Sequence, residues 1–135
     1  MIHQVLQPAG WPRPSGYANG IAARGRQVFI AGQVGWNAEC RIVSDRFADQ
    51  VRQALANVVA ILAEAGGRPE HLVRLTWFIT SCNEYNGQLA QIGAAYRDII
   101  GRNFPAMSVV QVAALIEAGA KVEIEATAVI PDSGA

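Results

Sequence analysis

The chain has 135 residues, of which 51% are hydrophobic and 16% charged, and eleven basic residues balance eleven acidic ones. This composition suits a single domain over residues 1–135 with a sizeable core, and it excludes an intrinsically disordered chain. The lack of a basic excess argues against a protein that binds nucleic acid or an anionic membrane surface. A globular domain usually carries about a quarter charged residues, so we expect an oligomeric interface to cover part of this surface.

The sequence shows no secretory signal, and no window is long and apolar enough to span a membrane. Cys40 and Cys82 are too few for a disulfide framework and have no metal-ligand spacing. His3 and His71 are isolated, and the motifs of phosphate-binding loops and zinc proteases are missing. We therefore expect a cytoplasmic protein without a metal site.

The N-terminal third is predicted to be mostly β-structure. Prolines and glycines make residues 7–16 irregular, because proline fixes φ and lacks the donor that a ladder needs. Strands are expected at residues 17–24 and 27–31, joined by a tight turn. Apolar residues on both faces of the second strand, such as Phe29 and Ile30, indicate a central position in a sheet. A loop is then predicted by Gly32, Gly35 and Asn37.

Two helices are predicted, each with one apolar stripe. Ser44 is the expected N-cap of the first helix, which Gly66 should end. Its stripe consists of Phe47, Val51, Leu55, Val58 and Leu62. The second helix is expected to begin with a capping box from Ser81 to Glu84 and to end at Gly101. Its stripe consists of Leu89, Ile92, Tyr96 and Ile99.

The remaining apolar runs predict strands. A branched and aromatic run at residues 72–80 separates the helices, and two more strands are expected at 107–115 and 121–130. Apolar and polar residues alternate in the last strand, beginning with Val122 and Glu123. Both helices can cover one face of a mixed six-stranded sheet, which is an α+β fold. The other face needs a cover, and a second subunit is the simplest source of it.

Four short segments carry residues that could form a site, although each also has a purely structural reading. Glycines shape turns, a tyrosine packs, and two glutamates can simply face solvent. The segments are residues 15–20, 31–37, 104–107 and 122–126. Their order, together with Gln50, Asn57, Ala65-Gly66 and residues 73–78, resembles the reactive intermediate deaminase family, also called the YjgF/UK114 family and formerly described as endoribonucleases. The resemblance covers essentially the whole chain.

This resemblance implies a chorismate-mutase-like subunit that forms a homotrimer with small-molecule clefts between neighbouring subunits. Active members hydrolyse small imines and enamines to ketones and ammonia, without a metal or an organic cofactor. Tyr17 matches the family's catalytic tyrosine, and Glu123 matches the glutamate that orients the attacking water. The residues expected to bind substrate are Gln33, Trp36, Trp77, Ala106 and Met107.

Met107 stands where the resemblance places the arginine that binds the substrate carboxylate. The methionine thioether has no N–H donors and cannot replace the planar guanidinium group of an arginine. Losing a guanidinium–carboxylate contact costs on the order of a hundredfold or more in binding affinity. We therefore expect a larger, neutral or aromatic substrate, unless Arg24, Arg74 or Arg102 reaches the cleft. Three functions stay open: a deaminase-like hydrolase with an altered substrate, a non-catalytic metabolite-binding trimer and, least favoured because of the zero net charge, a ribonuclease.

Overall fold

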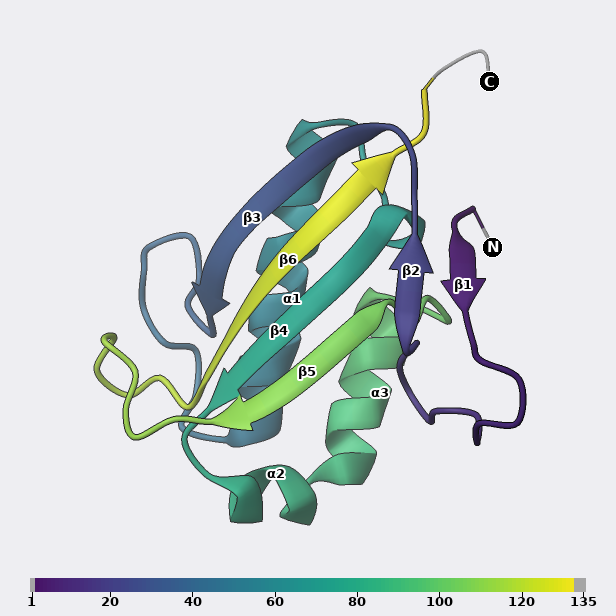
Figure 1. The fold of residues 1–135 in the computed structure, drawn as a ribbon. Coiled ribbons are helices and arrows are strands. Elements are labelled where there is room, and N and C mark those ends of the chain that lie inside the picture. The colour runs from purple at the N-terminus through teal and green to yellow at the C-terminus, as the bar shows by residue number, and fades with distance from the viewer. Residues whose placement is uncertain (1, 133–135) are drawn as a thin grey trace.

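A four-stranded mixed sheet forms the centre of the structure, a computed structural model that describes residues 2–132 (Figure 1). Its strands lie in the order β3-β6-β4-β5, with bounds Arg26–Val34, Val122–Ile130, Leu72–Ile79 and Ala106–Gln111. β5 runs parallel to β4, and the other neighbours are antiparallel. β1 (Gln4–Leu6) and β2 (Gly20–Ala22) form a separate two-stranded ladder, near the end of the sheet where β4 and β5 begin.

The three α-helices of the described chain lie on one face of this sheet, as expected of its helices (Figure 1). α1 (Phe47–Glu64) and α3 (Leu89–Ile99) pack against each other, and α2 (Cys82–Gly87) is a short turn of helix before α3. The five residues of the predicted α1 stripe are completely buried, and each burial stabilises the fold by roughly 1.5–3 kcal/mol. They meet core residues of β4 and β6, namely Leu75, Trp77, Ile79, Val122 and Ile124.

The opposite face of the sheet is open. The alternation predicted for the last strand is confirmed, because Val122 and Ile124 are buried under the helices while Glu123 and Glu125 point to the open face. Phe29 on β3 also points there and is 73% exposed. The expectation that β3 is a central strand is wrong, since β3 is the edge of the four-stranded sheet. Its apolar residues on both faces reflect the uncovered face and not a central position.

The expected six-stranded sheet is corrected to a sheet of four strands and a ladder of two. Among the described residues, Ala18 pairs the backbone of the N-terminal segment with the main sheet: its N–H donates to the Pro105 carbonyl at 2.9 Å, and it bridges to Ala106. Residues 17–24 contribute only the three residues of β2. The prolines of residues 7–16 lack N–H donors, so this segment cannot continue the pairing along β5.

The second predicted helix is broken at Gln88, which divides it into α2 and α3. The Gln88 side chain accepts a hydrogen bond from the Ala48 N–H at 3.0 Å, in the first turn of α1. That contact satisfies one of the N–H donors that have no partner within α1. Ser44, the expected N-cap, does not satisfy it. Ser44 accepts from the Arg46 N–H at 3.0 Å, so the helix begins after Arg46.

At the start of α2 the predicted cap is confirmed in part. The Ser81 hydroxyl accepts from the Glu84 N–H at 3.1 Å, as an N-cap should. The Glu84 carboxylate does not complete the box but forms an ion pair with Lys121, at 3.1 Å. The contact ties the start of α2 to the residue that precedes β6.

Candidate functional site

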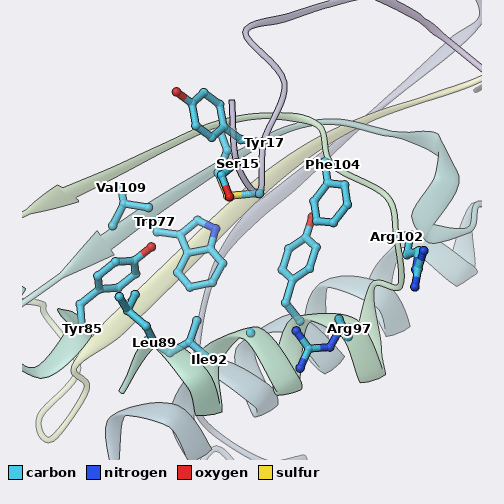
Figure 2. A pocket seen from close by; sticks show the side chains of 14 residues that line it. Ser15, Tyr17, Trp77, Tyr85, Leu89, Ile92, Arg97, Arg102, Phe104 and Val109 are labelled. Carbon is cyan, nitrogen blue, oxygen red and sulfur yellow. The ribbon is translucent and has the colours of Figure 1, made fainter. Parts of the chain in front are cut away.

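A cleft of about 810 Å³ lies on the helix side of the sheet, between the edge strand β5, helix α3 and the segment around Tyr17 (Figure 2). This volume is within the range of roughly 300–1,000 Å³ that is typical of small-molecule sites. Its floor is formed by Trp77 of β4 with Met107 and Val109 of β5. Strand pairing explains why Met107 and Val109 lie on this side of the sheet. They are opposite Leu75 and Trp77 in the neighbouring strand, and both of those side chains point to the helices.

The indole of Trp77 is the most deeply buried part of this floor. Trp77 is 2% exposed, and its ring lies edge-to-face against Tyr85, with centroids 6.4 Å apart. Among the described residues, the buried Trp77 Nε1–H has no hydrogen-bond partner. A buried donor without a partner costs about 1–3 kcal/mol. Figure 2 shows the indole nitrogen on the edge of the ring that faces Phe104.

The wall opposite Trp77 is a pair of stacked aromatic rings. Tyr96 of α3 and Phe104 lie nearly parallel, with their centroids 5.7 Å apart. The Tyr96 hydroxyl donates to the Asn103 carbonyl at 2.5 Å, which holds the ring in place. Burial raises the pKa of Tyr96 and also that of Tyr85, because the charged phenolate is disfavoured away from water. Both phenols are therefore protonated at neutral pH, and burial holds their protons more firmly than in an exposed tyrosine.

Two guanidinium groups lie on the rim of the cleft, those of Arg97 and Arg102 (Figure 2). Neither forms an ion pair within residues 2–132, and no carboxylate of those residues lines the cleft. A methyl group placed at Gly93 would lie 3.4 Å from the Arg97 Nη1. The Arg97 side chain therefore extends back along α3 and over Gly93, which itself lines the cleft.

The candidate arginines from the sequence differ in position. Arg102 lines the cleft within the same chain, as one of the three expected alternatives. Arg74 lines a separate cleft of about 300 Å³ with Ala106, and Arg24 is not part of the main cleft. Arg97 was missed, because an exposed arginine on a helix gives no local signal of a site. The only hint is its spacing of four residues from Gly93, which places both on one side of α3.

Of the residues predicted for the site, Tyr17, Trp77 and Met107 line the main cleft. Gln33, Trp36, Ala106 and Glu123 are not among its lining residues, and their roles remain predictions. Glu123 pairs with Phe78 on the open face, so within one chain the sheet separates it from Met107. The side chain of Glu123 lies against the backbone of Gly32, where a methyl group would overlap its carboxylate.

Tyr85 and Tyr96 were also not predicted as site residues. The break at Gln88 turns α2 so that Tyr85 lies beside Trp77, and no pattern in the sequence indicated that break. Within residues 2–132 no three His, Cys, Asp or Glu side chains come together in a group able to hold a metal ion. No helix in the same residues has the length and apolar character needed to cross a membrane.

The fold and the cleft can now be compared with known proteins. The family described as Endoribonuclease L-PSP matches residues 12–130, and this chain belongs to that family, which is also called YjgF or Rid. The human 2-iminobutanoate/2-iminopropanoate deaminase is 32% identical over 130 residues, which cover 96% of this chain and 91% of the human protein.

Two solved structures extend the comparison. The Rid-family protein YyfB of Yersinia pestis, a protein of unknown function, is 35% identical with a TM-score of 0.81, and the match covers 96% of this chain and all of that one. E. coli TdcF, solved with bound serine, is 32% identical with a TM-score of 0.67, over 94% of this chain and 98% of that one. The expected family membership and the α+β fold are thus confirmed.

Proposed function

We propose that this protein is a deaminase-like hydrolase that converts an imine or enamine of a small metabolite to a ketone and ammonia. Water adds to the imine carbon, and the C–N bond of the resulting adduct breaks, so one imine and one water give one ketone and one ammonia. The observation that carries the proposal is the cleft beside Tyr17, lined by aromatic rings and guanidinium groups, in a chain related to named imine deaminases. No cofactor enters this reaction.

The proposed reaction requires a second subunit. Tyr17 lies at the cleft on the helix side, while Glu123 lies on the open face, so the two meet only if the open face of one subunit covers the cleft of another. We propose a homotrimer built in this way. It is supported by the exposed Phe29 and Val110 on the open face, since apolar side chains at such a place favour an interface.

In such an interface, Glu123 would act on the attacking water. Its carboxylate would accept a proton from the water and return it to the departing nitrogen. Gly32 supports the role, because the space that its missing side chain leaves is filled by the Glu123 carboxylate. The proposed division of labour is thus a binding cleft from one subunit and a proton-transfer group from its neighbour.

The test is an imine-trapping assay. An amino-acid oxidase generates the imine, semicarbazide traps it, and a deaminase lowers the yield of trapped product. We expect the protein to accelerate imine loss and Glu123→Gln to reduce the rate by on the order of a hundredfold. Glu125→Gln is the matched control, since Glu125 lies two residues away on the same face, and it should leave the rate nearly unchanged.

Met107 favours a second candidate function, a trimer that binds a metabolite without converting it. Met107 lies on the cleft floor, at the position where the resemblance places an arginine that binds a carboxylate. If no imine is consumed with any amino acid tried, but a carboxylate metabolite still binds in the cleft, the non-catalytic reading replaces the hydrolase. Met107→Arg sharpens the choice. Imine hydrolysis that appears in this variant and disappears with Glu123→Gln would mean that Met107 alone limits catalysis.

A further inference from the structure

Within one chain, the main cleft offers hydrogen-bond donors and positive charge but no negative charge. The Trp77 Nε1–H is buried without an acceptor, and the Tyr85 phenol keeps its proton because burial raises its pKa. Arg97 and Arg102 add two guanidinium groups, and no aspartate or glutamate of the described residues lines the cleft. Such a set of groups is complementary to a ligand that carries a carboxylate and at least one further acceptor.

The walls of the same cleft are aromatic and apolar. Trp77 lies on one side and the stacked pair of Tyr96 and Phe104 on the other. Leu89 and Ile92 of α3 add branched side chains along the helix. A four-carbon metabolite would leave most of these surfaces uncovered in a cleft of about 810 Å³, whereas an aromatic or branched body could lie between the rings.

The charges lie at a different place from position 107, where the resemblance places an arginine. Position 107 on the floor is a methionine, while Arg97 and Arg102 lie on the rim, on α3 and just after it (Figure 2). The Arg97 Nη1 lies beside Gly93, 3.4 Å from where a methyl group there would stand, which is an ordinary van der Waals contact.

We propose that the cleft binds a carboxylic acid with an aromatic or branched apolar side chain, with its carboxylate on Arg97 and Arg102 and a second acceptor on the Trp77 Nε1–H. This inference rests on the proposed function, for which it names the substrate class: a bulky 2-imino acid whose product is the corresponding 2-oxo acid. The carboxylate then enters at the rim and the apolar side chain lies over Met107. Arg97, Arg102 and Trp77 become residues that determine specificity.

Calorimetric titration of the full-length protein tests the inference without any need for turnover. The probes are phenylpyruvate, pyruvate and the methyl ester of phenylpyruvate, which separate the aromatic ring from the negative charge. We expect phenylpyruvate to bind more tightly than either of the others, by about tenfold or more, because a hydrogen bond to a charged group is worth more than a neutral one. Equal affinity for the acid and its ester would overturn the inference.

Substitutions then locate the contacts. Arg97→Gln and Arg102→Gln should each weaken phenylpyruvate binding by about tenfold and leave the weak binding of the ester unchanged. Arg52→Gln is the matched control, since Arg52 is an exposed arginine that pairs with Asp98 outside the cleft. Trp77→Phe keeps an aromatic ring but removes the donor, and it should weaken binding of the acid and the ester alike. If Arg97 and Arg102 can both be replaced without loss of affinity for phenylpyruvate, the assignment of the carboxylate to these two arginines is wrong.

The outcome can be separated from that of the proposed function. If phenylpyruvate binds with the expected dependence on Arg97 but no imine is hydrolysed, the hydrolase is wrong and the ligand class stands. If the imine of a small amino acid is hydrolysed as fast as that of phenylalanine, and Arg97→Gln has no effect on either rate, the hydrolase stands and the ligand class is wrong.

Discussion

The two faces of the central sheet are built from alternating residues of the same strands, yet they differ in almost every property. Away from the cleft beside β5 the helix face is closed, and Leu55, Leu75 and Ile124 are completely buried there. The open face carries the exposed Phe29 and the carboxylate of Glu123. The helix face therefore accounts for the stability of the single chain. On the open face, packing within one chain does not explain why an apolar ring such as Phe29 is exposed. The difference teaches that the core and the binding cleft share one side of the sheet, while the proposed proton-transfer group lies on the other.

The largest effect is expected from a cavity on the closed face. Leu55→Ala removes a completely buried side chain of α1 and should lower the free energy of unfolding by about 2–5 kcal/mol, measured by urea denaturation. Ile61→Ala is the control on the same helix, because Ile61 is 38% exposed, and it should cost less than about 1 kcal/mol. Equal losses in the two variants would mean that α1 does not contribute to the core as described.

A charge on the open face should affect assembly more than folding. Phe29→Asp places a carboxylate in the proposed interface, and we expect dissociation of the trimer with a cost of about 2 kcal/mol or more per interface. Light scattering should change from about three times the chain mass of 14.4 kDa to a single chain mass. Far-UV circular dichroism should stay unchanged. A wild-type protein that is already a single chain in dilute buffer would contradict the proposed site.

A smaller effect is expected where the open face positions Glu123. Gly32→Ala introduces a methyl group that overlaps the Glu123 carboxylate, so this flexible side chain must move. We expect about a tenfold loss of deaminase activity, since a displaced proton-transfer group loses part of its effect. The urea midpoint should change little. Gly87→Ala is the control, because a methyl group there meets no other atom within 4 Å, and it should leave activity intact.

The smallest effect concerns His71, at the end of the sheet where β4 begins. Its Nδ1 accepts the Arg68 N–H at 2.9 Å, and its carbonyl lies 3.2 Å from the Nε2 of His3. Burial lowers the pKa of His71 below its ordinary value of 6.5, and Arg68 and His3 act in the same direction while Glu70 opposes them.

The sign of the effect on stability follows from this pKa. In the window from pH 6.5 down to the lower pKa of the folded state, the unfolded chain binds more protons at His71 than the folded chain does. The free energy of unfolding should therefore fall as the pH is lowered through this window. Urea denaturation between pH 7.5 and 5.5 measures it, and His71→Asn should remove most of the slope. An increase in stability over the same window would contradict the assignment.

The parts of the fold that the sequence predicted are those with a local period. The stripe from Phe47 to Leu62 and the alternation in β6 were both confirmed, because helices and strands place residues on faces at fixed spacings. The family was recognised for a related reason, since its motifs keep their order along the chain. Tyr17, Trp77 and Met107, three of the residues predicted for the site, line the same cleft, and their roles remain predictions.

What only the tertiary structure decided comes from contacts between distant segments. Gln88 leaves the helical path because its side chain satisfies the start of α1, forty residues earlier, and that break brings Tyr85 beside Trp77. The position of Arg97 on the rim and the unpartnered N–H of Trp77 likewise depend on how α3 packs against β4 and β5. Hydrophobic periodicity records which face a residue occupies, but it carries no information on which donor finds a partner. The class of protein was therefore readable from the chain itself, while the groups that would select its ligand emerged only from the packing of its elements.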